Sequence, residues 1–521
     1  MKSKFRISKN KLLFYLIVII VLNFVSIYTI LTSFPKEKVI KSSKKIRPPK
    51  NYNRNKKPVV NVNDVHNDID DNDVDIFSNQ SVDNNKIMIE NFRKFFMNTI
   101  ESVDDSKNIN LLREKTEIHR IIWEQLFGTD DFSYKHVLNT LLKYQEENLP
   151  LVNLFYKVHK NLYPWIYGKK FLAIDELIKT YHGRGIVICT GSLHFKYAKS
   201  TIDTLRNLIK TRLPIEVFYY GSDDLSEREQ QILLSYPNVY ISNIEDYFNT
   251  DVIQCKKRSI KPYAMLASRF MEVILIDADA MFIRDPVELF QSDGYEETGT
   301  FFFRDRTFKG TSSNDSLQWF KEWAKDPLPE TRSSRFWNGI TVHEMDSSTV
   351  VINKEKALLG LLAACKLNEL EVRENMVYRH IDNEKETFWM GFDMARQHYY
   401  MNEQPISFIG SIQTELSLDN ENSNNENSMI CGHIAHTMDD GRIMFWNGHL
   451  VADKDDDSSA LLDFELYVME SDNDNNNKWK DSPLCYYIDN EDEIVPLDDK
   501  EKIFIDVIKE RAFNDNILLG Y

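Results

Sequence analysis

The most informative chemical pattern in this chain is a pair of carboxylates at the end of an apolar run. Residues 273–276 are apolar and lead directly into Asp277-Ala278-Asp279. A short run of β-branched apolar residues is typical of a buried strand, and residues i and i+2 of an extended chain share one face. Two such carboxylates repel each other unless a cation lies between them, and hard divalent ions commonly join carboxylates to a diphosphate. The pattern therefore favours a metal site over the alternative, a pair of solvated or capping aspartates.

Other residues could complete a site for a phosphorylated ligand. Lys261 lies near the start of a predicted helix before the aspartates, and it is either a phosphate contact or a surface lysine. Thr190 and Gly191 follow the first predicted strand, where they either line a nucleotide or form an ordinary tight turn. A sugar nucleotide has a diphosphate leaving group, whose developing charge a divalent metal can neutralise. This chemistry predicts sugar transfer from a nucleotide donor.

Alternating strands and helices must position these residues. Such alternation predicts an α/β fold with a mainly parallel, doubly wound sheet, whose ligand site lies at the carboxyl ends of the strands. The chain contains no Gly-x-Gly-x-x-Gly and no Walker lysine loop, which argues against dinucleotide-binding and P-loop proteins. The predicted strands span residues 185–191 (with a closing turn), 215–220, 239–241 and 273–276, and the predicted helices span about 196–210 and 261–270.

The chain divides into five predicted segments. Residues 1–11 are basic, and 12–31 are almost wholly apolar and long enough to cross a bilayer as a helix. The basic flank predicts a cytoplasmic tail and a type II membrane anchor, with a cleaved signal peptide as the alternative. Residues 32–83, rich in Lys, Asn and Asp, predict a disordered stem. Helix-like apolar spacing in 84–182 predicts a helical subdomain, and 183–521 form the predicted catalytic domain.

Charge and cysteine spacing argue against two classes of protein. The formal net charge is −16 and the isoelectric point is near 5.3, whereas nucleic-acid binding relies on clustered Lys and Arg. The five cysteines contain no C-x-x-C pair, which argues against a zinc finger. Up to two disulfides could form in an oxidising compartment, and the spacing does not assign their partners.

Motifs between residues 183 and 448 carry a more specific signal. They are Gly-Arg-Gly-Ile-Val at 183–187, Leu-Pro-Ile-Glu-Val at 213–217, Lys-Pro-Tyr-Ala at 261–264, Asp-Ala-Asp at 277–279, Glu-Thr-Gly-Thr-Phe-Phe-Phe-Arg-Asp-Arg at 297–306, His-Glu-Met-Asp-Ser-Ser at 343–348, Glu-Lys-Glu-Thr-Phe-Trp at 384–389 and Trp-Asn-Gly at 446–448. In these motifs the chain resembles the fungal Golgi α-mannosyltransferase family, type II membrane enzymes that extend mannan and O-linked mannose chains.

The resemblance implies a fold and a chemistry. It implies a GT-A-type fold, GDP-mannose as donor, Mn²⁺ as metal and retention of the α configuration. The implied acceptors are mannose-terminated N- or O-glycans on glycoproteins. Asp277 and Asp279 match the metal motif of the family.

The resemblance also implies candidates around the donor sugar. Arg304 lies in the stretch expected to face that sugar, unless it pairs with Asp305 or Glu297. Glu384 and Glu386 lie in a region that supplies a carboxylate near the reactive face of the sugar in related retaining enzymes, so we expect one of them to be catalytic. The family commonly reads Gly-Asp-Lys-Glu here, and this chain has Glu384 in place of the Asp. The alternative is a solvated helix N-terminus, where the helix dipole favours acids.

A third metal ligand is expected near the C-terminal end of the core, because related retaining enzymes often use a late histidine. The candidates are His433, His436 and His449, of which His436 and His449 are preferred. An ordinary core or surface histidine is the alternative for each of them.

Together these features predict a Golgi membrane α-mannosyltransferase with its catalytic domain in the lumen, acting in α-1,3 linkage. Three alternatives stay open at this point. They are α-1,2 transfer, a catalytically inactive glycan-binding homologue, and a metal-dependent phosphohydrolase.

Overall fold

The computed structural model describes residues 90, 91, 94 and 104–519, with gaps at 129–132, 147–149, 309–312, 416–426, 453–460, 472–477, 482–483 and 489–492. The predicted tail, membrane anchor and stem fall outside the described residues. Within the described ranges, no helix combines the length and the apolar character needed to cross a bilayer.

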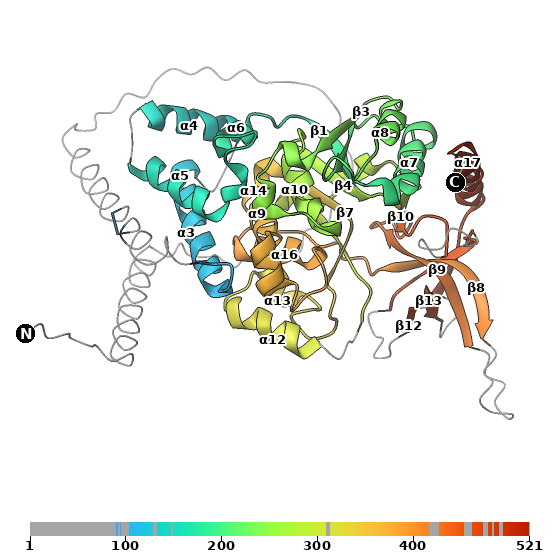
Figure 1. Cartoon of the computed structure of the whole chain (residues 1–521). Coiled ribbons are helices and arrows are strands. Elements are labelled where there is room, and N and C mark those ends of the chain that lie inside the picture. The colour runs from blue at the N-terminus through green and yellow to red at the C-terminus, as the bar shows by residue number, and fades with distance from the viewer. Residues whose placement is uncertain are drawn as a thin grey trace, which may run out of the picture. The chain divides into compact units, whose positions relative to one another are not determined.

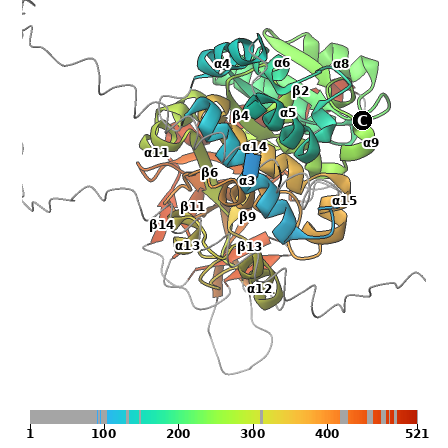
Figure 2. The same cartoon turned by 90° about the vertical axis from the view of Figure 1, so that its left-hand side faces the viewer.

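Helices precede the first strand, as the apolar spacing of this segment predicts (Figure 1). Their bounds are α3 (Ile109–Phe127), α4 (Tyr134–Glu146), α5 (Pro150–Leu162) and α6 (Ile174–Ile178). The buried side chains of α5 recur at helical spacing, since Val152, Phe155, Val158 and Leu162 are each at most 2% exposed. Helix α3, which Figure 2 shows on the side facing the viewer, contacts α5, α12 (Ser313–Trp323) and α16 (Lys385–Met394).

A six-stranded sheet forms the centre of the fold, in the order β3-β2-β1-β4-β7-β6. Strands β3, β2, β1 and β4 pair in parallel, and β7 is antiparallel to both of its neighbours. The α/β class is therefore confirmed, and the sheet is mixed with mainly parallel strands. The bounds are β1 (Arg184–Cys189), β2 (Ile215–Tyr219), β3 (Val239–Asn243), β4 (Glu272–Asp277), β6 (Thr300–Arg304) and β7 (Met345–Asn353).

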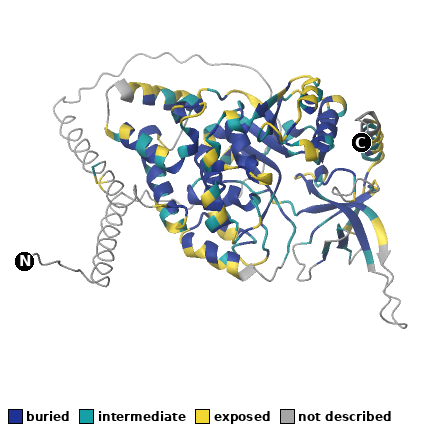
Figure 3. Ribbon diagram, in the orientation of Figure 1, coloured by how far each residue is buried: buried dark blue, intermediate teal, exposed yellow. Residues whose placement is uncertain are grey.

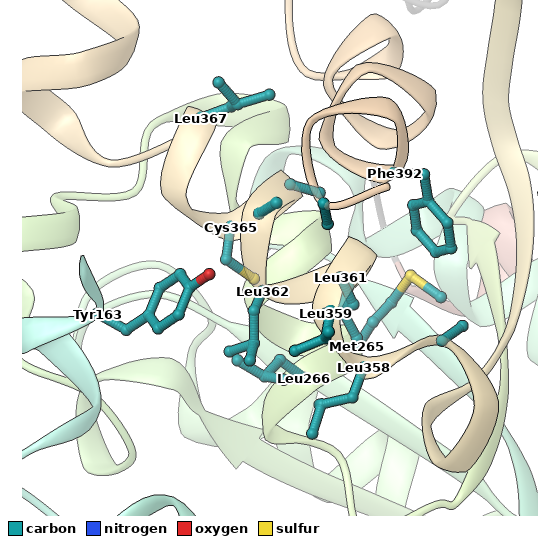
Figure 4. Packing of buried hydrophobic residues seen from close by; sticks show 14 of the residues in the cluster. Tyr163, Met265, Leu266, Leu358, Leu359, Leu361, Leu362, Cys365, Leu367 and Phe392 are labelled. Atoms are coloured by element: carbon teal, nitrogen blue, oxygen red, sulfur yellow. The ribbon is translucent and has the colours of Figure 1, made fainter. Parts of the chain in front are cut away.

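Both faces of the central sheet are covered, which explains the continuous apolar run in β4. Val273 and Leu275 point into a core shared with α3, α5, α10 (Ile260–Ala267), α14 (Lys354–Leu367) and α16. Ile274 and Ile276 point into a second core with α7 (Phe195–Asp203). Figure 3 shows the central strands buried between exposed outer helix faces, and Figure 4 shows the first core around α14.

One glycine allows α14 and α16 to pack closely. A Cβ at Gly391 would lie 2.5 Å from the backbone nitrogen of Ala364, so any larger residue would push the two helices apart. Glu384, a predicted site residue, precedes the first residue of α16 and makes no side-chain capping hydrogen bond.

A second, antiparallel sheet is built mainly from the C-terminal part of the chain, and the sequence patterns did not predict it. Its strands are β5 (Ala280–Phe282), β8 (Ser407–Glu415), β9 (Asn427–Thr437), β10 (Ile443–Asn447), β11 (Leu466–Met469), β12 (Trp479–Asp481), β13 (Leu484–Tyr487) and β14 (Ile494–Pro496). Helix α17 (Asp499–Leu519) follows them, and its Ile505 and Ile508 are buried in a core with this sheet. A disulfide joins Cys431 of β9 to Cys485 of β13, and the other three cysteines are free thiols.

Two buried histidines in the helical segment predict acid-sensitive stability. His119 and His159 are at most 1% exposed, and their ring centroids lie 5.1 Å apart. Burial lowers the pKa of His119 to about 3 and lowers that of His159 well below its ordinary value. The unfolded chain, with histidine pKa values near 6.5, therefore binds these protons first, and stability is lost as the pH falls below 6.5.

The loss should approach about 1.4 kcal/mol per pH unit for each histidine. Urea unfolding between pH 7.5 and pH 5 measures it. We expect a shallower loss for His119→Phe, and the wild-type slope for His136→Gln, which changes an exposed histidine. An unchanged slope in His119→Phe would contradict the assignment.

Candidate active site

The carboxyl ends of β1 and β4 bring three predicted residues together. These strands pair in parallel with Cys189 opposite Asp277, and Thr190 follows directly, buried and hydrogen-bonded to the β2 backbone at 3.0 Å. A Cβ at Gly191 would lie 2.2 Å from Oδ1 of Asp224, so a larger residue would have to displace the Asp224 side chain. Thr190, Gly191 and Asp277 therefore share the edge where an open α/β sheet places its ligand.

Backbone hydrogen bonds connect Asp279 to the turn after β10. The carbonyl oxygen of Asp279 accepts the N–H of His449 at 2.8 Å and the N–H of Gly448 at 3.2 Å. Pairing of β5 with β10, which sets Ala280 opposite Asn447, brings these segments together. Among the predicted late histidines, His449 is thus the one whose backbone binds the second aspartate.

The other two late histidines have different surroundings. Nε2 of His436 lies 2.7 Å from Oδ2 of Asp346, and the His436 ring packs against Phe303 and Phe445 with centroids 4.8 Å away. The ring of His433 lies under the turn at Gly448, where a Cβ would come within 2.4 Å of Nδ1. The structure therefore places His436 with Asp346 rather than with the aspartate pair.

Lys261 is the centre of a buried charge cluster. Its Nζ lies 2.8 Å from Oδ1 of Asp277 and 3.1 Å from Oε1 of Glu384. It also donates to the carbonyl and the hydroxyl of Ser347, at 3.2 and 3.1 Å. Lys261 is 4% exposed, so in this arrangement it neutralises two carboxylates from separate elements.

Burial and charge together set the protonation of this cluster. Burial raises the pKa of Asp277 to about 6, although the charge of Lys261 acts in the opposite direction. Burial acts to lower the pKa of Lys261, but the nearby negative charges of Asp277 and Glu384 together have the larger effect and raise it. Burial acts to raise the pKa of Glu384, but the positive charges of Lys261 and Arg258 hold it below its ordinary value. Glu384 is therefore ionised at neutral pH.

The structure distinguishes the two predicted glutamates. Oε1 of Glu384 accepts a hydrogen bond from the Ser347 hydroxyl at 2.9 Å, while its buried Oε2 has no hydrogen-bond partner among the described residues. The carboxylate of Glu386 instead accepts the N–H of Glu344 at 3.1 Å and the indole N–H of Trp389 at 2.6 Å. Glu384 belongs to the charge cluster, and Glu386 braces the backbone behind it.

Arg258 is a residue of this site that the sequence analysis missed. Burial acts against its charge, but Glu384, Asp277, Asp279 and Asp346 together raise its pKa. Arg258 is partly exposed to solvent, and these acids act on its guanidinium through their charges. The available signal was the basic run 256–258 directly before Lys261.

Arg304 and Asp305 lie at the end of β6 and do not pair with each other. Asp305 binds Lys385, with 2.7 Å between Oδ2 and Nζ. In the part of the chain that the structure describes, the buried Nε of Arg304 has no hydrogen-bond partner. Neither predicted partner of Arg304, Asp305 or Glu297, forms an ion pair with it in this part.

A divalent cation needs several oxygen or nitrogen ligands close together, and the residues around Asp279 can be compared with this requirement. Across the described ranges, no three side chains of His, Cys, Asp or Glu converge closely enough to hold a metal ion. Asp277 already binds Lys261. The carboxylate of Asp279 and the imidazole of His449 are donors of the kinds that divalent cations accept, and the backbones of these two residues are hydrogen-bonded to each other.

Known proteins resemble this chain over its central part. The sequence model of one family, described as "Mannosyltransferase putative", matches residues 183–438. Two curated relatives are "Putative alpha-1,3-mannosyltransferase MNN14" of Candida albicans, 26% identical over 55% of this chain and 48% of the relative, and "Alpha-1,3-mannosyltransferase MNT3" of Saccharomyces cerevisiae, 25% identical over 46% of this chain and 42% of the relative. The matched region thus spans about half or less of the length of these relatives.

Among solved structures, the chain is similar to the mannosyltransferase Ktr4p of S. cerevisiae in complex with GDP. The identity is 11% and the TM-score is 0.30, over 55% of this chain and 84% of that one.

Proposed function

The chain belongs to the family of mannosyltransferases that this sequence model describes, and from that premise we propose that it transfers mannose from GDP-mannose to mannose-terminated glycans. The proposal includes a GT-A-type fold, Mn²⁺ as the metal, retention of the α configuration and an α-1,3 linkage. The α-1,3-mannosyltransferase names of the relatives support this linkage over α-1,2. The acceptors, N- or O-glycans of glycoproteins, are part of the proposal.

The observation that carries this proposal is the meeting of both aspartates with groups from distant parts of the chain. Asp277 binds Lys261, which also binds Glu384, and the backbone of His449 binds that of Asp279. Acidic and basic groups therefore converge at the carboxyl edge of the central sheet, inside or close to the region matched by the family. Such an edge suits a charged ligand like a sugar diphosphate.

In this proposal, Asp279 and His449 would hold the divalent cation together with oxygens of the donor diphosphate. The cation would neutralise charge on the departing diphosphate. Arg258 would bind the same diphosphate, because a guanidinium forms strong charge-assisted hydrogen bonds with phosphate oxygens.

Glu384 is the carboxylate that we assign to the sugar. It is ionised, fully buried, and one of its oxygens is not committed to a hydrogen bond within the described residues. A fixed negative charge stabilises the positive charge that develops on the sugar carbon in an oxocarbenium-like transition state. Lys261 holds Glu384 in place through the ion pair at 3.1 Å.

A Golgi location, with the catalytic region in the lumen, is also part of the proposal. The Cys431–Cys485 disulfide supports an oxidising compartment. The apolar segment 12–31 supports membrane attachment, although it lies outside the described residues.

The test is a transfer assay on the full chain in detergent, with GDP-mannose, Mn²⁺ and an α-mannoside acceptor. We expect a mannosylated product that is lost with EDTA and restored by Mn²⁺, and a new α-1,3 linkage in its NMR spectrum. An α-1,2 linkage would correct the regiochemistry alone. Binding of GDP without transfer would favour the glycan-binding alternative, and release of phosphate from simple esters would favour a phosphohydrolase.

A further inference from the structure

We propose that Glu470, in the C-terminal sheet, is a positioning residue of the active site. It binds the loop after β6 and so holds Asp305 at the site that the proposed function assigns to mannosyl transfer. Glu470 follows β11 and lies beyond the family-matched region, which ends at residue 438. In this inference the second sheet helps to position residues of the active site. The inference rests on the proposed function.

Glu470 is buried and its carboxylate is saturated with donors. It accepts the backbone N–H of Thr307 at 3.0 and 3.2 Å, one bond to each oxygen, and the Thr307 hydroxyl at 2.9 Å. The indole N–H of Trp479 donates to Oε1 at 2.7 Å. The backbone N–H of Glu470 itself donates to Ile406 at 2.8 Å, so the carboxylate is anchored on the sheet. Burial raises the pKa of Glu470, and the hydrogen bonds from Trp479 and Thr307 act in the opposite direction because they stabilise the ionised carboxylate.

The loop that Glu470 binds is joined through Asp305 to Lys385, the residue after Glu384 of the buried charge cluster. Asp305, two residues before Thr307, binds Lys385 at 2.7 Å, and Lys385 directly follows Glu384 in the chain. Burial acts to lower the pKa of Lys385, but the charges of Asp305 and, to a smaller extent, Asp346 raise it. A shift of Thr307 would therefore move Asp305 relative to the start of α16.

Arg335 holds the same loop from its other side. It donates to the Thr307 hydroxyl at 3.1 Å and to the carbonyl of Glu344 at 2.9 Å. That carbonyl also accepts the N–H of Asp305 at 3.0 Å. Arg335 lies 3.8 Å from Glu470, so its charge compensates the buried carboxylate. Thr307 is thus held between Arg335, which precedes β7 of the central sheet, and Glu470, which follows β11 of the second sheet.

The first test compares Glu470→Gln with Glu465→Gln, which removes an exposed carboxylate of the same segment. Hydrogen exchange of the amides at 305–308 should accelerate in Glu470→Gln and stay unchanged in Glu465→Gln. Hydrogen exchange can be measured without enzymatic activity. Unchanged exchange would therefore count against this inference, whereas absence of transfer by the wild-type chain would count against the proposed function. Unchanged exchange at 305–308 in Glu470→Gln would overturn the inference.

Kinetics supply the second test. We expect Glu470→Gln to lower kcat by about 10²-fold, because small displacements of positioned groups have effects of this size, while the affinity for GDP, which lacks the sugar, stays unchanged. In an Asp305→Asn background the same substitution should have little further effect, since coupled residues are not additive. Equal losses in both backgrounds would overturn the inference.

A second pair of variants tests the same positioning role in case Glu470→Gln does not fold. Thr307→Val removes the hydroxyl that Glu470 and Arg335 bind, whereas Thr307→Ser keeps it. We expect Thr307→Ser to be at least tenfold faster than Thr307→Val, and equal rates would contradict the positioning role.

Discussion

Replacing Asp279 with alanine should lower mannosyl transfer by about 10²–10³-fold, the loss typical of removing one group that stabilises transition-state charge. The side chain of Asp279 is partly exposed at the edge of the sheet, so the substitution removes a proposed metal ligand and little core packing. Initial rates at saturating GDP-mannose and Mn²⁺ measure the effect, and thermal unfolding checks the fold.

The matched control for this prediction is Asp439→Ala, which removes an exposed aspartate in the turn between β9 and β10. It should transfer mannose at the wild-type rate. A wild-type rate in Asp279→Ala would remove the basis for the metal assignment.

Replacing Lys261 with methionine should both abolish transfer and destabilise the fold. The substitution leaves Asp277 and Glu384 buried without the ammonium that neutralises them. Removing one partner of a buried ion pair typically lowers the free energy of unfolding by about 3–5 kcal/mol. Chemical denaturation measures the loss, and Lys500→Met, at an exposed lysine, should show almost none.

A second substitution sharpens this prediction. Adding Glu384→Gln to Lys261→Met removes one of the two uncompensated carboxylates, so part of the stability should return while transfer stays absent. A double variant that is less stable than Lys261→Met alone would show that charge compensation is not what Lys261 contributes.

The residues at the strand ends could be predicted because local pattern and topology determine them. The run 273–276 is apolar throughout since both faces of β4 are covered. Once β1 and β4 are parallel neighbours, Thr190 and Asp277 must meet at one edge. These inferences need only the strand pattern and the rules for parallel sheets.

Contacts between distant segments explain what the sequence could not determine. Glu384 and Glu386 both lie at the start of α16, and only the tertiary partner of Glu386, the N–H of Glu344, shows that it has a bracing role. The choice of His449 over His436 depends on the pairing of β5 with β10, strands more than 150 residues apart.

The second sheet was missed for a related reason. Several of its strands are short, such as β11 and β12, and they pair across long or interrupted connections. No local period separates such strands from loops, and the disulfide partners Cys431 and Cys485 follow from that pairing.

The most direct measurement is the affinity for GDP, determined by calorimetry with Mn²⁺ and with EDTA, for the wild-type chain and Asp279→Ala. If Asp279 and His449 hold the cation that binds the donor diphosphate, Mn²⁺ should strengthen GDP binding to the wild type by tenfold or more and leave binding to Asp279→Ala unchanged. Equal affinities with and without Mn²⁺ in the wild type, or the same Mn²⁺ effect in both proteins, would contradict it.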